Sequence, residues 1–397
     1  MSESPLASLP PAARAALDRL WAILPHARLV GGCVRDLLAG RALNDVDLAT
    51  VEAPEVVQAT LEAAGIKVVP TGLAHGTVTA VIDRAPYEIT TLRRDAETDG
   101  RHAVVVWTDD WREDAARRDF TINAMSLDRA GVLHDYFDGQ RDLAARRVRF
   151  VGDPAARIRE DALRVLRFFR FDARFGGETP DAAALAAIRA GAALVDGLSA
   201  ERVAGELLRI LAGPRAVRAI GSMDDAGVLR RWLPEAHLRI GLLDRLVAAG
   251  GPPDAILLLG ALCDAPDLAR RLRLSGAQAA RLEAMRGAAL PIEASDDDLR
   301  RARADWPLET LLDRLWLCQA ARSGAPDAAW DGLRARLEAM PRPVFPLSGK
   351  DAVKAGIAPG PGVGVALRRV EAWWREEGCR PGRESALRRL DEVVAQG

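Results

Sequence analysis

The chain has 397 residues, of which 49% are hydrophobic and 28% charged, and its formal net charge is −1, all ordinary for a globular protein. This length suggests two to four domains. No run of about 18 apolar residues occurs, which argues against a membrane span. Residues 1–30 carry prolines and charges where an export signal would have an apolar core, so we expect no such signal. Because the net charge is not basic, any nucleic-acid surface must be a local patch.

The four cysteines are widely spaced along the chain. They are Cys33, Cys263, Cys318 and Cys379, and no two of them form a CxxC pair. This spacing argues against disulfides and against a zinc site, and it fits a reducing compartment. We therefore expect a cytoplasmic protein.

The first predicted element is a helix over residues 10–24, PPAARAALDRLWAIL. Its apolar side chains Leu17, Leu20, Trp21 and Leu24 recur at helical spacing and form one face. We expect that face to pack on the core of the first domain.

A glycine turn comes next. Residues 29–30 read as the end of a buried strand, and Gly31 and Gly32 follow it. Residues 34–38 then begin a helix that carries Arg35. A backbone without Cβ atoms can approach a ligand closely, and an arginine fork suits a phosphate. Taken alone, such a turn is usually structural.

An acidic pair follows the turn. In the run Asn44 to Leu48, NDVDL, we predict a strand on which Asp45 and Asp47 share one face. Two neighbouring carboxylates repel each other unless a cation lies between them. Mg²⁺ prefers such oxygen ligands, with substrate phosphates completing its coordination. The pair therefore predicts a divalent-metal site.

The glycine turn, the arginine and the acidic pair follow one another in an order that resembles a known family. GGCVRDLL followed by NDVDLAT resembles the nucleotidyltransferase superfamily that includes DNA polymerase β. More narrowly, it is similar to the class II tRNA nucleotidyltransferases, the CCA-adding enzymes, and to their bacterial poly(A) polymerase relatives. The resemblance implies an α+β head with a small mixed β-sheet, followed by an all-α neck, body and tail in an elongated molecule. It also implies two Mg²⁺ ions held by Asp45 and Asp47, and a nucleotide cradled by Gly32 and Arg35.

Alternating patterns predict the rest of the head sheet. Residues 67–70, 77–82 and 87–92 read as strands, the last two as a hairpin across residues 83–86. Glu88 lies on the second hairpin strand, where it could stand beside the acidic pair in one sheet. The superfamily often draws a third carboxylate from a neighbouring strand, so the resemblance implies a catalytic role for Glu88.

Residues 93–112 are polar and turn-rich around Asp99 and Gly100. They resemble the flexible loop of CCA-adding enzymes, which helps to switch specificity from C to A. EITTLR and TDGRHA look most like the mitochondrial-type enzymes. The presence of this loop argues against the variants that add only CC.

Residues 113–128, EDAARRDFTINAMSLD, read as a helix. An arginine pair beside an aspartate is by itself most often a surface ion pair. The string RRDFTINA matches the family closely, however, and implies that Arg118 contacts the nucleotide phosphates. It also implies that Asp119 accepts from a ribose hydroxyl, which would select ribonucleotides. Asn123 is expected to orient these groups.

Residues 148–175 contain the second strong motif. From Ile158 onward an apolar stripe predicts one helix, with Asp161 and Arg164 three residues apart on a neighbouring face. Arg167 and Arg170 continue that ridge. Without the family match, an amphipathic helix with a solvated arginine face would be the simpler interpretation.

The neighbouring Asp161 and Arg164 suggest how bases are chosen. Cytosine and adenine each present a donor beside an acceptor, which matches an Asp–Arg pair, whereas uracil and guanine reverse both groups. A site built to hydrogen-bond rejects such mismatches by factors of about 10⁴. EDALRVLRFFRF resembles the class II motif assigned this task, which implies that Arg167 and Arg170 also bind the nucleotide.

The remainder reads as helical, with predicted helices at 199–211, 215–233, 242–264, 267–288, 296–303, 307–323 and 327–340. In the first of these, the resemblance implies that Arg202 braces the neck or reaches an RNA phosphate. In the last segment, Lys350 and Lys354 accompany glycine-rich turns that the family uses to hold tRNA. We predict a head at 1–150, a neck at 151–215, a body at 216–325 and a tail at 326–397.

Together these features predict template-independent addition of C, C and A to tRNA from CTP and ATP. A poly(A) polymerase is the alternative within the family, but such enzymes often carry a basic tail, which this chain lacks. A non-catalytic RNA-binding protein would be expected to have lost its carboxylates. P-loop and dinucleotide binders are disfavoured because neither fingerprint occurs. The His134-Asp135 doublet suggests a phosphohydrolase, but the five histidines are scattered. The sequence predicts no oligomeric state.

Overall fold

The computed structural model describes every residue except 1–3, 44, 74–75, 99–102 and 397. The chain divides into two compact units, Met1–Trp232 and Leu233–Gly397. The predicted division into four domains is finer than this and stays a prediction.

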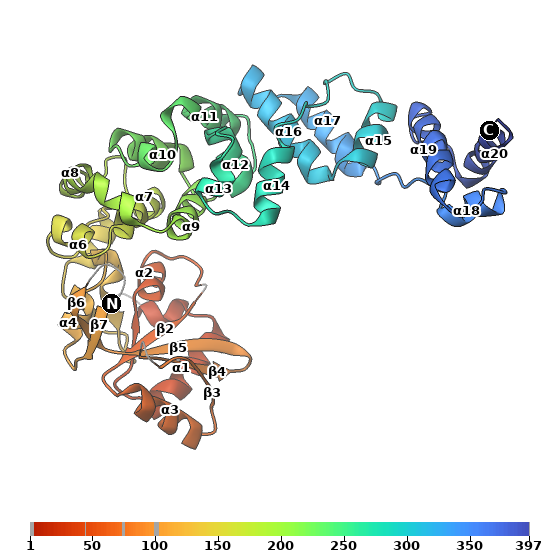
Figure 1. The fold of residues 1–397 in the computed structure, drawn as a ribbon. Helices are drawn as coiled ribbons and strands as arrows, with labels where there is room; N and C mark the ends of the chain where they lie inside the picture. Colours follow the sequence, from red (N-terminus) through yellow and green to blue (C-terminus); the bar gives the residue numbers. More distant parts are fainter. Residues whose placement is uncertain (1–3, 44, 74–75, 99–102, 397) are drawn as a thin grey trace. The chain divides into compact units, whose positions relative to one another are not determined.

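A mixed β-sheet forms the head, as predicted (Figure 1). Within the described residues its strand order is β3-β4-β5-β2-β1-β8-β9. The strands are β1 (Arg28–Val30), β2 (Asp47–Thr50), β3 (Lys67–Gly72), β4 (Thr77–Ile82), β5 (Ala85–Thr91), β8 (Met125–Leu127) and β9 (Leu133–Asp135). Strands β2 and β5 run parallel, and the other neighbouring pairs are antiparallel. The β4–β5 turn is tighter than predicted, because Asp83 and Arg84 both adopt positive φ, as a two-residue hairpin turn requires.

The two faces of this sheet differ. Helices α1 (Pro11–Ile23) and α3 (Pro54–Ala63) cover one face, where the predicted apolar stripe of α1 is buried in the main core. The other face holds only a small cluster of Val30, Ala49 and Leu92, against which Trp111 packs. Asp47 projects on this thinly covered face, because it lies two residues before Ala49 on the same strand.

Strands β6 (Arg93–Thr98) and β7 (Ala103–Trp107) pair antiparallel. We predicted a flexible, turn-rich loop here. Its described part is a two-stranded sheet, and the predicted turn at Asp99 and Gly100 lies outside the described residues.

The predicted helix over 113–128 is wrong. Helix α4 spans only Trp111–Ala116, a 3₁₀ turn (η3) covers Thr121–Asn123, and β8 begins at Met125. The chain is extended at Phe120, which bridges to Phe150. This long-range pairing overrides the local helical pattern.

The predicted helix running on from Ile158 is also corrected. It is two helices, α6 (Pro154–Glu160) and α7 (Leu163–Phe175), and Asp161 between them is extended. The carboxylate of Asp161 accepts from the backbone N–H of Leu163 at 3.0 Å, which stabilises the break. The first unit also contains α2 (Gly32–Leu38), α5 (Gly139–Ala144), α8 (Ala182–Gly191), α9 (Ala200–Leu211) and α10 (Ala216–Asp225).

The second unit is helical, and its described residues contain no strand. Its helices are α11 (Ile240–Ala248), α12 (Ala255–Leu262), α13 (Leu268–Arg271), α14 (Gly276–Ala284), α15 (Asp296–Asp305), α16 (Leu308–Arg322), α17 (Ala328–Ala339), α18 (Gly349–Lys354), α19 (Pro361–Glu376) and α20 (Arg383–Ala395). The single helix predicted at 242–264 is interrupted, because Gly250 adopts positive φ and two prolines follow it. None of the helices in the described part of the chain is both long and apolar enough to span a bilayer.

Candidate active site

Three carboxylates gather on the thinly covered face of the head sheet. Asp47 opens β2 and stands in register with Glu88 on the parallel strand β5, so the predicted placement of Glu88 beside Asp47 is confirmed. Asp45 lies just before the strand instead of on it, which corrects the predicted strand start. Burial raises the pKa of Asp47, and the charges of Glu88 and Asp45 raise it further, while Arg118 opposes them. This donor set therefore carries negative charge that protein cations only partly balance.

The carboxylates fit a hard divalent cation. No group of three His, Cys, Asp or Glu side chains among the described residues could hold an ion unaided. That finding is compatible with Mg²⁺, which is commonly bound by one or two carboxylates with substrate phosphates and waters as its other ligands. Asp45 and Asp47 would hold the ion, whose positive charge would offset the repulsion that Glu88 and Asp45 exert on Asp47.

The glycine turn lies beside the acids. Gly31 has a φ of +71°, and a Cβ at this position would lie 2.8 Å from Nη1 of Arg118, so only glycine fits. Gly32 starts α2, and the thiol of Cys33 donates to the backbone carbonyl of Asp47 at 3.5 Å. The turn, Arg118 and the acidic strand are thus held as one unit.

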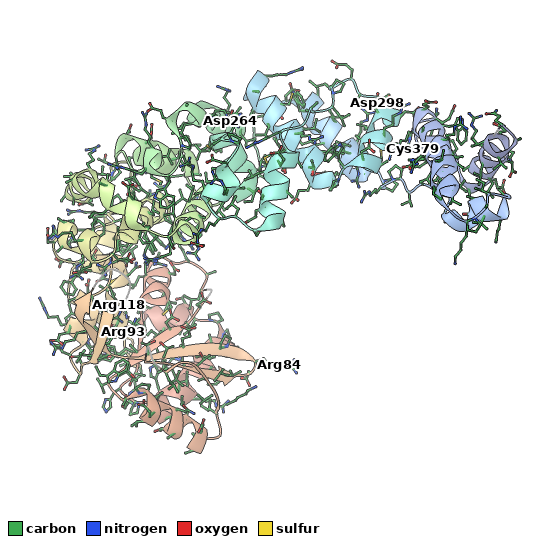
Figure 2. The ribbon with its side chains drawn as sticks, in the orientation of Figure 1. Arg84, Arg93, Arg118, Asp264, Asp298 and Cys379 are labelled. Carbon is green, nitrogen blue, oxygen red and sulfur yellow. The ribbon has the colours of Figure 1, made fainter. Side chains whose placement is uncertain are left out.

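Arg118 is the cation closest to this turn, and Figure 2 labels it. Its Nε and Nη2 donate to Asp114 at 3.3 and 3.0 Å, and Arg117 binds the other oxygen of the same carboxylate. Burial acts to raise the pKa of Asp114, but Arg118 and Arg117 together bring it below its usual value. Asp114 therefore fixes Arg118 with one edge of its guanidinium over the glycine turn.

Arg35 lies beneath the turn and is buried. It forms two hydrogen bonds with Asp36, at 3.0 and 2.9 Å, and Nη1 donates to Oδ1 of Asn123 at 2.5 Å. Its guanidinium also stacks over Phe175, with Cζ 4.3 Å from the ring centroid. A Cβ on Gly32 would lie 3.5 Å from Nη2 of Arg35, so this arginine packs closely beneath the turn, and its phosphate contact stays a prediction.

Asp119 connects the head to the neck. One carboxylate oxygen accepts from Asn123 and from the backbone of Phe120, each at 2.9 Å, and the other accepts two bonds from Arg167. Burial would raise the pKa of Asp119, but Arg167 and Asn123 lower it below its ordinary value. All four acceptor positions are occupied by protein donors, so a ribose hydroxyl would have to displace one of them. The ribose contact stays a prediction.

Asp161 and Arg164 do not bond to each other through their side chains. Asp161 accepts two bonds from Nη2 of Arg202, at 3.1 and 2.8 Å. Arg164 donates to Glu160 at 2.6 Å and to the backbone carbonyl of Arg117 at 3.2 Å. The second of these bonds places Arg164 against the segment that carries Arg118. Arg164 therefore faces the head, whereas the carboxylate of Asp161 is turned toward Arg202 of α9, and joint reading of a base by the two side chains stays a prediction.

Arg167 and Arg170 continue along α7. Arg167 binds Asp119 as described, and Nε of Arg170 donates to Glu206 of α9 at 2.6 Å. Glu206 is only 2% exposed and also accepts from Arg209 at 3.2 Å. Among the described residues, no hydrogen bond engages Nη1 of Arg167 or either Nη atom of Arg170. These donors remain available to a nucleotide.

A pocket of about 460 Å³ opens beside the base-reading motif. Asp161, Arg202 and Ser199 line it, together with the end of α6. Arg202, predicted to bind RNA or to brace the neck, here holds Asp161. Lys350 and Lys354, also predicted to bind RNA, are exposed on α18 of the second unit.

Sequence reasoning did not single out Glu206 or Asp114 in this site. Glu206 follows Val203 by three residues and precedes Ile210 by four, which places a carboxylate on the apolar stripe of α9. A charged residue on a buried helical face was the signal that could have found it. Asp114 gave no comparable signal, because its helix is short.

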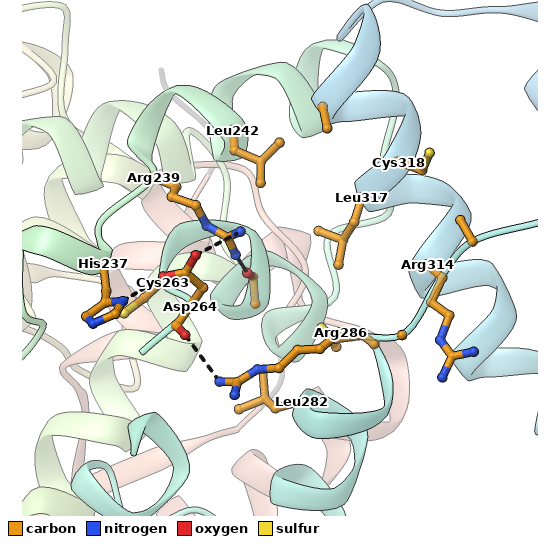
Figure 3. A pocket seen from close by; sticks show the side chains of 15 residues that line it. His237, Arg239, Leu242, Cys263, Asp264, Leu282, Arg286, Arg314, Leu317 and Cys318 are labelled. Carbon is orange, nitrogen blue, oxygen red and sulfur yellow. Dashed lines mark hydrogen bonds and ion pairs between the residues drawn. The ribbon is translucent and has the colours of Figure 1, made fainter. Parts of the chain in front are cut away.

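A larger pocket, of about 580 Å³, lies within the second unit (Figure 3). Its basic side chains are already engaged, since Arg239 pairs with Asp264 and Arg286 donates to backbone carbonyls. His237 also bonds to Asp264, at 2.9 Å. This pocket contains none of the predicted site residues, and size alone does not make it the active site.

Comparisons with known proteins agree with this geometry. Residues 27–149 match the poly A polymerase head domain, and residues 179–239 match the probable RNA and SrmB-binding site of polymerase A. The chain is 35% identical over 381 residues to the mitochondrial CCA tRNA nucleotidyltransferase 1 of Mus musculus, covering 91% of this chain and 85% of that protein. It is 33% identical over 369 residues to a CCA-adding enzyme of Geobacillus kaustophilus, covering 88% of each.

A solved structure is similar over nearly the whole chain. The Bacillus stearothermophilus CCA-adding enzyme in complex with CTP matches with a TM-score of 0.76 at 30% identity, covering 98% of this chain and 99% of that one. The similarity therefore extends through the helical units as well as the head.

Proposed function

The chain belongs to the CCA-adding enzyme family of tRNA nucleotidyltransferases, and we propose that it adds C, C and A to the 3′ end of tRNA, using CTP and ATP and releasing pyrophosphate. The resemblance seen in the glycine and aspartate motifs is thereby confirmed. The observation that carries the proposal is the register of Asp47 with Glu88 in the head sheet, with Arg118 held beside the glycine turn. A poly(A) polymerase would use the same head, but the relatives that match this chain nearly end to end are CCA-adding enzymes.

Catalysis rests on the carboxylates of the head. Asp45 and Asp47 hold Mg²⁺, and Glu88 adds a third negative charge on the neighbouring strand. When bound, divalent ions lower the pKa of the RNA 3′-hydroxyl and balance the charge of the triphosphate. Gly32, Arg35 and Arg118 bind the triphosphate, Arg35 from beneath the glycine turn. Positioning and charge neutralisation then supply most of the rate enhancement.

Base choice rests on the neck. Asp161 accepts from the exocyclic amino group of cytosine or adenine, and Arg164 donates to the neighbouring ring nitrogen. Arg202 orients the carboxylate of Asp161, and Glu160 orients the fork of Arg164. Arg167 and Arg170 supply further donors to the nucleotide. In this way protein groups replace a nucleic-acid template.

The domain boundaries, the RNA contacts and the compartment concern the whole chain. We infer a head at 1–150, a neck at 151–215, a body at 216–325 and a tail at 326–397, the last binding tRNA through Lys350 and Lys354. All four cysteines lie in the described part of the chain and are free, which supports a reducing compartment such as the cytoplasm. Some relatives of this chain are mitochondrial forms.

Labelled CTP or ATP offered with tRNA that ends at the discriminator base, at C or at CC tests the proposal. Ordered addition that stops after A supports it, and long A tails on any RNA would favour the poly(A) alternative. Asp45→Ala should abolish incorporation while the far-ultraviolet circular dichroism spectrum stays unchanged. Arg19→Gln, on the exposed surface of α1 across the sheet, is the control and should remain active.

A further inference from the structure

Three of the arginines proposed to bind nucleotide surround one aromatic ring. Among the described residues, the guanidinium carbons of Arg35, Arg167 and Arg170 lie 5.2, 5.4 and 4.5 Å from the centroid of Phe171. Arg35 belongs to the head and the other two to α7. The ring is 6% exposed, so these contacts are formed away from bulk water.

Each of these arginines has its own carboxylate. Arg35 pairs with Asp36, Arg167 with Asp119 and Arg170 with Glu206. All three carboxylates are buried, at 9%, 9% and 2% exposed. The carboxylates fix one edge of each guanidinium, but none of them bridges two of the three arginines. The ring of Phe171 is a neighbour that all three guanidinium groups share.

The ring of Phe171 is suited to attract these cations. The face of an aromatic ring carries negative electrostatic potential, which attracts cations within about 6 Å of the centroid. The ring itself packs against two other aromatic rings, that of Phe120 of the head at 5.2 Å and that of Phe175 of α7 at 6.0 Å between centroids. Phe120 directly follows Asp119, so the ring and the carboxylate that binds Arg167 are positioned by the same segment.

We propose that Phe171 is a positioning residue for the nucleotide site, one that gathers Arg35, Arg167 and Arg170 through cation–π attraction. The inference rests on the proposed function. The gathered arginines keep Nη1 of Arg167 and the Nη atoms of Arg170 directed at the incoming nucleotide. Phe171 touches no reacting atom, so its loss weakens nucleotide binding and leaves the chemical step nearly unchanged.

Stepwise fluorination of Phe171 in the full-length protein tests this inference. Replacing it with 4-fluoro-, 3,5-difluoro- and 3,4,5-trifluorophenylalanine withdraws charge from the ring face while the shape is almost conserved. We expect the KM for CTP and for ATP to rise with each fluorine, reaching roughly tenfold for the trifluorinated protein. We expect kcat to stay within about twofold, because the carboxylates are untouched.

Phe169 provides the matched control. It lies on the same helix and is 2% exposed, and among the described residues no arginine lies over its ring. The same fluorinated series at Phe169 should leave both KM values unchanged. KM values that do not change with fluorination of Phe171, or that rise equally with fluorination of Phe171 and of Phe169, would overturn the inference. If the unmodified protein incorporated neither CTP nor ATP, the proposed function would fail instead, so the two failures are distinguishable.

Discussion

Every arginine proposed to bind nucleotide is held by a carboxylate in this structure. The pairs are Arg35 with Asp36, Arg118 with Asp114, Arg164 with Glu160, Arg167 with Asp119 and Arg170 with Glu206. Such pairing keeps the cations oriented before a nucleotide arrives, and preorganised donors act with little reorganisation. Asp47 is the opposite case, because its neighbours Glu88 and Asp45 are also acidic. The arginines of the site thus have carboxylate partners already, whereas the cluster of Asp45, Asp47 and Glu88 lacks enough positive charge to balance it.

Replacing Asp47 with Asn should abolish incorporation, by at least about a thousandfold, and should not destabilise the fold. The folded-state pKa of Asp47 is raised, so its ionised form lowers stability above about pH 4. Removing that charge should raise the thermal midpoint by about 1–3 °C at pH 7 without metal. Added Mg²⁺ should raise the midpoint of the wild type and leave that of Asp47→Asn unchanged. A lower midpoint in the variant would contradict the charge argument.

Asp119 predicts the opposite pH dependence. Its folded-state pKa is depressed, so its contribution to stability is complete above the unfolded value of about 4 and is lost as the pH falls through the folded-state pKa. Asp119→Asn should therefore cost about 3 kcal/mol at pH 7, because Arg167 loses its partner. Urea unfolding between pH 2.5 and 7 would measure this difference, which should shrink only below about pH 4. A constant difference across that range would contradict the assignment.

At the scale of elements, α9 acts as a support for the base-reading motif. Arg202 and Glu206 lie one helical turn apart and reach Asp161 and Arg170 respectively. Helix α7 follows the break at Asp161, and its last turn packs on the head through Phe175. The helix break at Asp161 and the contacts from α9 therefore both determine the positions of the side chains proposed to read the base.

Replacing Arg202 with Gln should loosen base choice. Asp161 would lose its two charge-assisted hydrogen bonds and hold its orientation less well. We expect misincorporation of UTP and GTP to rise by about tenfold or more relative to CTP, since the acceptor no longer has one fixed position. Arg209→Gln, on the same helix but 67% exposed at the side chain, is the control and should keep its fidelity. Unchanged fidelity in Arg202→Gln would show that Asp161 is oriented by other groups.

The alternating strands, the glycine turn and the Asp47–Glu88 neighbourhood could be predicted from the sequence, because each depends on local periodicity or on a short motif. The break at Asp161 was missed because the helical pattern continues across it, although its carboxylate caps Leu163 locally and is also held by Arg202, 41 residues away. The end of α4 was missed because Phe120 pairs with Phe150 across the fold. Phe171 looked like one more apolar position on a helix, and only the structure shows that arginines from two elements meet on it.

At the scale of the whole molecule, all the proposed catalytic and nucleotide-binding residues lie in the unit Met1–Trp232. The two lysines proposed to hold tRNA lie in the unit Leu233–Gly397. This division predicts that nucleotide and tRNA affinities can be changed separately.

The double variant Lys350→Gln/Lys354→Gln should raise the KM for tRNA several-fold and leave the KM for CTP unchanged. Each lysine that contacts a phosphate adds to the salt dependence of binding, so the slope of log affinity against log salt should become shallower by about one to two. Lys67→Gln, at an exposed position of β3, is the control. An unchanged KM for tRNA would place the RNA contact elsewhere.

The measurement that tests the central claim most directly is sequencing of RNA 3′ ends after incubation of the protein with tRNA lacking CCA, Mg²⁺ and all four nucleoside triphosphates at equal concentration. We predict that the wild type extends the tRNA 3′ end to C, CC and then CCA and adds nothing further. Under the same conditions, we predict that Asp161→Ala adds a mixture of bases at these positions. Ends that carry runs of A, or an Asp161→Ala product identical to that of the wild type, would contradict a protein-encoded choice of base.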